Sequence, residues 1–249
     1  MSIYQQILKN SQSKKKQLAV LIDPDSYGTD GLLDVVNLCN AHKVDFLFFG
    51  GSLLMGNSLD DVLKITKQIS DIPTVIFPGS TLQISERADG ILFLSLISGR
   101  NPEHLIGNHV VAAPLLKHKD IEVISTGYML IDSGKQTTAS YMSQTTPIPA
   151  NKIPIAVSTA MAGEMLGLKL IFMDGGSGAL NAIGKEMISS VKKHIDIPLI
   201  IGGGIETVEM AEAAYSAGAD LIVVGNAIER DLNLIKSLGQ ARDAFSQNS

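Results

Sequence analysis

The 249-residue sequence predicts an α/β fold, a (β/α)8 barrel formed by a single domain over residues 1–249. Three observations support this fold class. Eight short apolar runs recur along the chain, helical patterns lie between most of them, and glycine-rich loops follow the last two runs. A doubly wound open sheet also alternates strands and helices. The two glycine-rich loops favour the barrel, because phosphate-binding barrels carry such loops after their last two strands.

Each apolar run is typical of a strand that is covered on both faces. Val, Ile, Leu and Phe follow one another without polar alternation, as in buried parallel strands. The hydrophobic fraction of 45% is enough for a large core. The predicted strands span residues 18–22, 46–50, 74–77, 90–94, 122–126, 169–173, 198–202 and 220–224.

Helical patterns follow the first, second and seventh predicted strands, over residues 30–42, 58–70 and 206–218. Ser58 is a suitable N-cap for the second of these helices, and Gly218 is a suitable stop for the last. Between the third and fourth strands there is room for only a short helix, so the third helix is expected to be short or missing. Residues 127–154, rich in Ser, Thr and Gly, form a long connection of the kind that often carries function.

The composition argues against nucleic-acid binding and against a membrane span. A formal net charge of -5 provides no basic field for nucleic acid. The apolar runs are far shorter than the ~20 residues that a membrane span needs, and the polar N-terminal segment does not resemble a signal peptide. The one cysteine, Cys39, lies in an apolar helical pattern and cannot form an internal disulfide, which predicts core packing and a cytoplasmic location.

The loops after the last two strands predict a phosphate site. Gly203 and Gly204 follow the seventh strand, and Gly225 and Asn226 follow the eighth. In many barrels the loops at these places bind phosphate through backbone N–H groups. The alternative is that the glycines only turn the chain tightly. The loop after the sixth strand, with the sequence FMDGGSG over 172–178, lies beside this pair and is expected to complete the anion site.

A second group of oxygen-bearing side chains follows the first two strands. Asp23 and Asp25 flank Pro24, and Ser52 follows the second strand. Carboxylate and hydroxyl oxygens suit Mg²⁺, which usually bridges to substrate phosphates. The alternative is that Asp23 only caps a turn before the proline. A phosphate site on one side of the barrel and a Mg²⁺ site on the other would fit two phosphorylated substrates.

Taken together, the motifs LIDPD, FGGS, FMDGGSGA, IIGGGI and VVGNAIE, in this order and spacing, resemble geranylgeranylglyceryl phosphate synthases and their heptaprenylglyceryl phosphate synthase relatives. The segments LSLISGRNP and GYMLIDSGKQTTASYMSQTTPIP resemble the second of the family's two main groups. The resemblance implies a modified barrel without the third helix. It also implies Mg²⁺-dependent transfer of a prenyl chain, expected to be geranylgeranyl, from its diphosphate to the C3 hydroxyl of sn-glycerol 1-phosphate, by a dimer or hexamer.

The resemblance also implies the roles of particular residues. Asp23 and Ser52 match the metal-binding positions, and Asp174 matches the glutamate that the family uses as general base. The family's sixth-strand motif reads Tyr-x-Glu, whereas this chain has Phe172 and Asp174. A turn cap is the alternative role of Asp174. The positions that match the glycerol phosphate site are Phe172, Met173, Asp174, Gly175, Gly176, Ser177, Gly178, Gly203, Gly204, Gly225 and Asn226.

Two further predictions concern the diphosphate and the prenyl tail. Arg100 follows the fourth strand and is expected to hold the diphosphate with its planar fork, with a loop salt bridge as the alternative. The apolar tail needs a groove, and Leu96, Ile97, Tyr128 and Met129 are expected past the strand ends, where they line that groove or belong to the core. The competing functions are another phosphate-handling barrel enzyme and a binding protein that has lost turnover.

Overall fold

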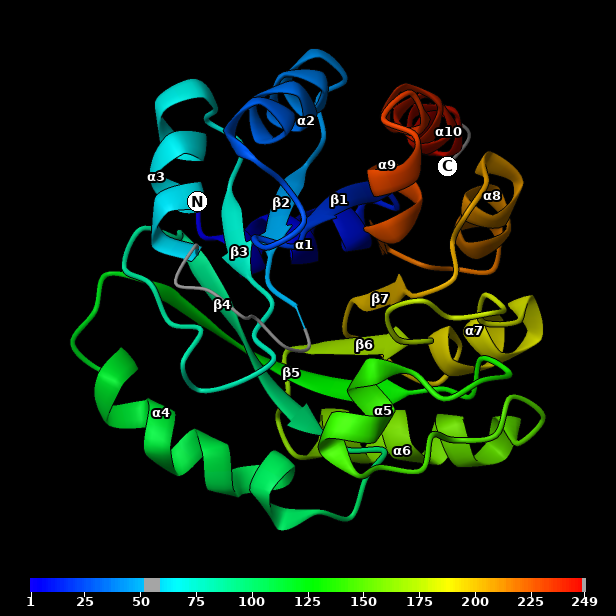
Figure 1. The fold of residues 1–249 in the computed structure, drawn as a ribbon. Helices are drawn as coiled ribbons and strands as arrows, with labels where there is room; N and C mark the ends of the chain where they lie inside the picture. Colours follow the sequence, from blue (N-terminus) through cyan, green and yellow to red (C-terminus); the bar gives the residue numbers. More distant parts are fainter. Residues whose placement is uncertain (52–58, 248–249) are drawn as a thin grey trace.

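The computed structural model describes residues 1–51 and 59–247, and in it eight parallel strands close into a barrel in the order β1 to β8 (Figure 1). β1 pairs with both β2 and β8, which closes the sheet. The predicted fold class is confirmed. The strands are β1 (Gln17–Ile22), β2 (Phe46–Phe49), β3 (Thr74–Ile76), β4 (Gly90–Leu96), β5 (Glu122–Leu130), β6 (Leu170–Asp174), β7 (Leu199–Gly202) and β8 (Leu221–Val224).

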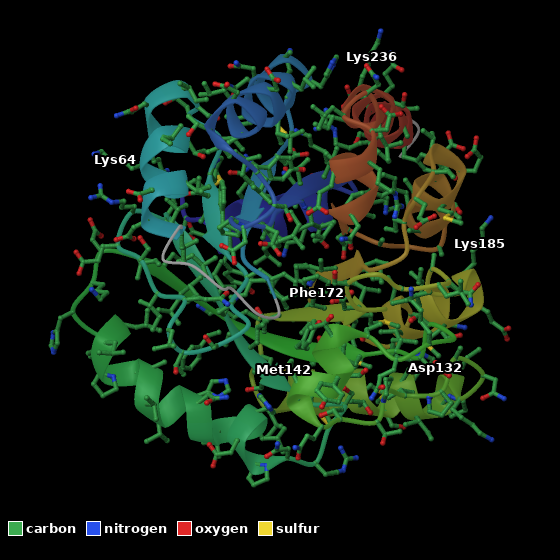
Figure 2. The ribbon with its side chains drawn as sticks, viewed as in Figure 1. Lys64, Asp132, Met142, Phe172, Lys185 and Lys236 are labelled. Atoms are coloured by element: carbon green, nitrogen blue, oxygen red, sulfur yellow. The ribbon has the colours of Figure 1, made fainter. Side chains whose placement is uncertain are left out.

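Helices surround the barrel, and the charged side chains labelled on them in Figure 2 point outward while Phe172 lies at the centre. The helices are α1 (Ile3–Gln12), α2 (Thr29–Ala41), α3 (Leu59–Ile69), α4 (Asn108–Leu116), α5 (Thr138–Ser143), α6 (Ile153–Met165), α7 (Lys185–Lys192), α8 (Val208–Ser216), α9 (Asn226–Arg230) and α10 (Leu234–Gln247), with a π-helical segment over Glu103–Gly107 directly before α4. Among the described residues, no helix is long and apolar enough to cross a membrane.

All eight predicted runs form strands, but β4 and β5 are longer than expected. Their ladder runs from the Gly90–Glu122 pair to the Leu96–Tyr128 pair. The additional pairing extends β5 to Leu130, so Leu96, Tyr128 and Met129 lie within strands and not past their ends. The prediction that these three residues lie past the strand ends was wrong. A barrel strand continues for as long as its neighbour supplies hydrogen bonds, and a single run of residues does not show where that pairing stops.

No helix connects β3 to β4, as the sequence predicts. Residues 77–89 form turns and irregular chain only, and Figure 1 shows α3 and α4 on the same side of the barrel with no helix between them. The outward side chains of β4 therefore have no helix from this connection to cover them. α4, which follows β4, packs beside this strand instead.

Apolar side chains form two layers, one inside the barrel and one between the strands and the helices. Ile3 and Ile7 of α1 belong to the inner layer, so α1 covers the amino end of the barrel. Backbone N–H groups of Ile3 and Tyr4 donate to the Glu122 carboxylate at 2.5 and 3.1 Å. The sequence did not predict this helix, because most of the N-terminal segment is polar. Cys39 is fully buried, as predicted.

The segment 127–154 is not a simple connection. Its first residues belong to β5, and Thr137 then starts the short helix α5 with a capping box that includes Ser140. Ala139 of α5 packs against the inner apolar layer. The segment therefore places a helix at the carboxyl end of the barrel, where barrel enzymes carry their active sites.

Candidate active site

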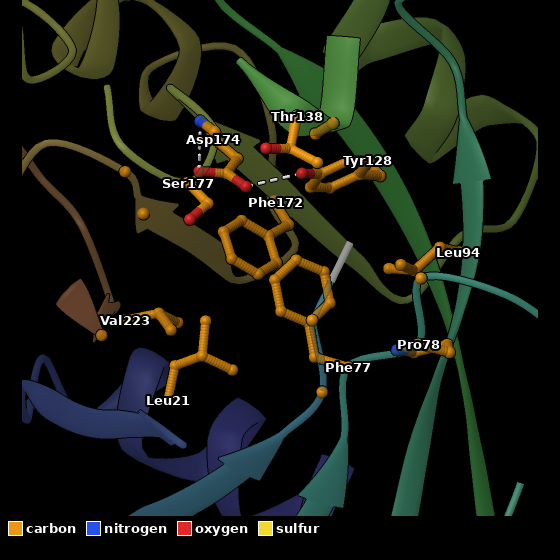
Figure 3. A pocket seen from close by; sticks show the side chains of 18 of the residues that line it. Leu21, Phe77, Pro78, Leu94, Tyr128, Thr138, Phe172, Asp174, Ser177 and Val223 are labelled. Carbon is orange, nitrogen blue, oxygen red and sulfur yellow. Dashed lines mark hydrogen bonds between the residues drawn. The ribbon is translucent and has the colours of Figure 1, made fainter. Parts of the chain in front are cut away.

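The carboxyl ends of the strands surround a cavity of about 710 Å³ that is shown in part in Figure 3. One end lies among the glycine-rich loops after β6, β7 and β8. The other end runs between β4 and α4, where the missing third helix leaves space. Of the predicted site residues, the cavity is lined by Asp23, Phe172, Asp174, Gly176, Ser177, Gly178, Gly203, Gly204, Gly225 and Asn226.

Asp174 is the buried carboxylate of this cavity. It ends β6, and only 6% of its surface is exposed. Its Oδ2 atom accepts a hydrogen bond from the Tyr128 hydroxyl at 2.5 Å, and its Oδ1 atom accepts one from Gly176 N–H at 2.8 Å (Figure 3). Burial raises the pKa of Asp174 above its ordinary value, and the two hydrogen bonds oppose that rise. The carboxylate therefore does more than cap the turn, because it also faces the cavity.

Three aromatic rings separate the glycine-rich end of the cavity from the apolar end. Phe77 and Phe172 are stacked with centroids 5.1 Å apart, and Tyr128 meets both rings edge-on at 5.7 and 5.6 Å. Figure 3 shows the Tyr128 hydroxyl turned toward Asp174 and away from the two phenylalanine rings. The rings thus give the carboxylate a low-dielectric surrounding on one side.

The glycine-rich loops after β6 and β7 pack directly on each other. Gly203 has φ +75°, and a Cβ atom there would lie 2.5 Å from Asp174 Oδ1 and 2.6 Å from Gly175 N. The N–H groups of Gly175 and Gly176 are already bonded, to Gly202 O and Asp174 Oδ1. The N–H groups of these two glycines therefore hold the shape of the loop, while Gly176, Gly203 and Gly204 line the cavity.

Asn226 joins the loop after β6 to the chain after β8. Its Oδ1 atom accepts hydrogen bonds from Ser177 Oγ and Gly178 N–H, both at 3.2 Å. Asn226 also begins α9, a short extra helix directly after β8. Barrels that bind phosphate use this helix together with the loop after β7. α8, in contrast, begins only at Val208, so the loop with Gly203 and Gly204 does not lead straight into a helix.

Asp23 follows β1, which pairs with β8, so it lies next to the loop after β8 and not, as the sequence predicted, on the opposite side of the barrel. The carboxylate lines the cavity, and its Oδ1 atom accepts a hydrogen bond from Asp25 N–H at 2.9 Å. Partial burial raises its pKa. Ser52, the second predicted metal residue, lies outside the described residues. In the described ranges 1–51 and 59–247, no three His, Cys, Asp or Glu side chains gather in a way that could hold a metal by themselves.

Three predicted site residues do not line the cavity. Met173 points into the outer apolar layer, and Gly175 lies behind the loop surface. Arg100 is exposed, and its Nη1 atom donates to Gly99 O at 2.6 Å and to Ile97 O at 3.4 Å. Arg100 therefore binds the backbone of its own loop and does not line the cavity.

The structure adds residues that the motifs did not indicate. Lys135, from the segment before α5, lines the cavity near Gly178, and Thr138 of α5 lines it beside Tyr128. Arg230 of α9 also lines it and is paired with Glu206 at 2.8 Å. The sequence signal for Lys135 was present, because it lies in the Ser, Thr and Gly-rich segment that was expected to be functional.

The apolar end of the cavity is a groove between the outward face of β4 and α4. Apolar side chains dominate its walls, with His109 as a polar member whose Nε2 atom lies 3.1 Å from Ser95 Oγ. Burial lowers the pKa of His109, so its ring favours the neutral form. Other residues of the groove are Ile84, Ile91, Phe93, Ala112 and Leu116.

Fold and site define the chain as a (β/α)8 barrel with a cavity lined by glycine-rich loops at the carboxyl ends of its strands, and comparison with known proteins gives its family. The PcrB family pattern matches residues 11–242, so the chain belongs to the PcrB family. A protein of Chitinophaga pinensis named geranylgeranylglyceryl phosphate synthase is 52% identical over 239 residues, covering 96% of this chain and 95% of that protein. One of the same name from Thermococcus gammatolerans is 40% identical, covering 87% of this chain and 86% of that protein.

A solved structure agrees with these sequence relatives. The crystal structure of (S)-3-O-geranylgeranylglyceryl phosphate synthase from Thermoplasma acidophilum, in complex with its substrate sn-glycerol-1-phosphate, superposes on this chain with a TM-score of 0.93. The two chains are 31% identical, and the match covers 98% of this chain and 99% of the other. The family resemblance predicted from the motifs is confirmed.

The packing of the two glycine-rich loops can be tested with Gly203→Ala and the control Gly167→Ala. Both glycines have positive φ, +75° and +84°, so both alanines carry a left-handed strain of about 1–2 kcal/mol. A Cβ at position 167 meets nothing within 4 Å, whereas one at 203 collides with Asp174 and the loop backbone. We expect Gly203→Ala to unfold at the lower temperature and to lose the rise in melting temperature caused by sn-glycerol 1-phosphate. Equal melting and equal ligand response of the two variants would contradict this packing.

Proposed function

We propose that the protein transfers a prenyl chain, expected to be geranylgeranyl, from its diphosphate to the C3 hydroxyl of sn-glycerol 1-phosphate. One observation carries the proposal. Asp174 lies in a single cavity between a glycine-rich loop cluster suited to phosphate and an apolar groove suited to a long hydrocarbon. Family membership and the names of the relatives support the same reaction.

The glycine-rich side of the cavity would hold the glycerol phosphate. Backbone N–H groups near Gly204 and Asn226, together with the ammonium group of Lys135, would hold the phosphate. The ligand bound to the Thermoplasma acidophilum relative supports this type of substrate. Such binding fixes the glycerol by its phosphate and leaves the far hydroxyl free to face Asp174.

Asp174 would then act as the general base. Its ionised form takes the proton of the C3 hydroxyl while the C3 oxygen attacks C1 of the prenyl chain. The bond between C1 and the diphosphate oxygen breaks, and the electron pair leaves with the diphosphate. Because burial raises the pKa of Asp174, the carboxylate is a stronger base than an exposed aspartate. Positioning of the two substrates supplies most of the remaining rate.

The Mg²⁺ site remains part of the proposal. Asp23 presents a cavity-facing carboxylate, and Mg²⁺ in phosphate-handling sites commonly uses one or two carboxylates together with substrate phosphates. The donor set therefore fits, with Asp23 and, by resemblance, Ser52 as the residues that would hold the ion. When bound, Mg²⁺ supplies neutralisation of the charge that builds on the leaving diphosphate.

The groove between β4 and α4 would bind the prenyl tail. It opens from the cavity at the place where the third helix is absent, and its walls are mainly apolar. A homo-oligomer, dimer or hexamer, and a cytoplasmic location also stay predictions from the sequence. Light scattering of the purified protein would give the oligomeric state directly.

The first test is turnover by Asp174→Asn. We expect the wild type to convert labelled geranylgeranyl diphosphate and sn-glycerol 1-phosphate in the presence of Mg²⁺, and the variant to lose kcat by about 100-fold or more with little change in binding. Asp132→Asn is the matched control, since Asp132 Oδ1 also accepts a hydrogen bond from the N–H two residues on, at 2.9 Å, but the residue is exposed. An inactive wild type would indicate that the protein binds phosphate ligands without turnover. A fully active Asp174→Asn would show that Asp174 is not the general base.

The second test concerns the metal. Asp23→Asn is expected to abolish Mg²⁺-dependent turnover and to leave the affinity for sn-glycerol 1-phosphate nearly unchanged, because the Asp23 side chain accepts its hydrogen bond from Asp25 N–H and not from a glycine-rich loop. Calorimetric titration measures the affinity of each variant for Mg²⁺ and for sn-glycerol 1-phosphate separately. Asp30→Asn, an exposed carboxylate in the first turn of α2, is the control. Loss of both ligands together would instead assign Asp23 a role in holding the fold.

The third test concerns the groove. Affinity is expected to rise with prenyl length until the groove is full, because each buried CH₂ contributes ~0.8 kcal/mol. Ala112→Phe narrows the groove from α4 and should shift the preference to shorter chains, whereas Ala113→Phe, on the exposed side of the same helix, should not. KM values for a series of prenyl diphosphates measure this. KM values that do not change with prenyl length would show that the tail does not bind in the groove between β4 and α4.

A further inference from the structure

We propose that Tyr128 is a positioning residue for Asp174, one whose hydroxyl holds the carboxylate in the orientation needed to accept the substrate proton. The inference rests on the proposed function, in which Asp174 is the general base. It adds a residue on β5 whose contribution is made through Asp174 and not through direct chemistry on the substrate.

Hydrogen bonds fix both oxygens of the carboxylate. Oδ2 accepts from the Tyr128 hydroxyl at 2.5 Å, and Oδ1 accepts from Gly176 N–H at 2.8 Å. The backbone donor comes from the loop after β6 and the hydroxyl donor from the neighbouring strand, so together they define both the plane and the tilt of the carboxylate. Each oxygen keeps a further lone pair, which is the capacity a general base needs.

The phenol itself has little freedom. Tyr128 is buried, and its ring contacts the faces of Phe77 and Phe172 edge-on, at interplanar angles of 73° and 86°. In the strand register Tyr128 pairs with Phe172, a ring of similar size without a hydroxyl. The hydroxyl beside Asp174 is thus supplied by β5, and the two phenylalanine rings hold it in place.

The same hydrogen bond opposes the effect of burial on Asp174. Burial raises the pKa of the carboxyl, and donation from Tyr128 favours the ionised form and lowers it. Tyr128 is the titratable group in contact with Asp174 among the described residues. The other ionisable residues that line the cavity come from the loop after β1, the π-helical segment, α4, the segment before α5, the loop after β7 and α9, and they are Asp23, His104, His109, Lys135, Glu206, Glu229 and Arg230.

The test is Tyr128→Phe, which keeps the ring and removes only the hydroxyl. We expect kcat to fall roughly 10- to 100-fold through loss of orientation, with little change in the KM for sn-glycerol 1-phosphate. The acid limb of the kcat–pH profile should move to higher pH, because the Asp174 pKa rises when a donor to its ionised form is lost. Tyr215→Phe is the matched control, as it removes another buried tyrosine hydroxyl, bonded to Gln17 O at 2.9 Å, outside the cavity.

A second measurement does not depend on the stability of the phenylalanine variant. Incorporation of 3-fluorotyrosine at position 128 makes the phenol a stronger donor and should move the acid limb to lower pH, opposite to Tyr128→Phe. A profile that stays in place in both proteins, with kcat near the wild-type value, would overturn the proposal. If the pH profile stays in place but Asp174→Asn is inactive, the proposed function stands and only the positioning role of Tyr128 is wrong. If Asp174→Asn is active, the general base itself is wrong.

Discussion

The buried carboxylate of Asp174 is the constraint on which the rest of the active site depends. A charge that is removed from water needs hydrogen-bond donors, and here they come from Gly176 N–H and the Tyr128 hydroxyl. The position of this carboxylate also explains why residue 203 is a glycine, because any side chain there would collide with Asp174 Oδ1. The three strand ends β5, β6 and β7 therefore form one unit, in which each element restricts the residues allowed on the next.

The second organising feature is a missing element. Without a helix between β3 and β4, the outward side chains of β4 face α4 across an apolar groove that joins the main cavity. Most barrels close this space with a helix, and here the chain crosses it with turns only. The cavity consequently combines two environments, a polar one at the glycine-rich loops and an apolar one outside β4, with aromatic rings of Phe77, Tyr128 and Phe172 at the junction.

These two environments suit a reaction between a small phosphate ester and a long hydrocarbon diphosphate. The protein needs little covalent chemistry for such a transfer, since the diphosphate leaves with its own electron pair and the acceptor loses one proton. In the proposed mechanism Asp174 takes that proton, and Asp23, which also lines the cavity, holds the metal beside the diphosphate.

The sequence by itself determined the fold class and the positions of the glycine-rich loops, and it indicated a short or missing third helix, because apolar runs and glycine clusters are local signals that follow one another along the chain. The tertiary structure decided which residues face the cavity. Arg100 binds the backbone of its own loop outside the cavity, Lys135 is brought to the cavity by the segment before α5, and α1 covers the amino end of the barrel. Tyr128 and Asp174 are 46 residues apart in sequence, and only the register between β5 and β6 brings the hydroxyl to the carboxylate. The register of two parallel strands depends on which of their residues, far apart in sequence, form hydrogen bonds with each other, so no local pattern contains it.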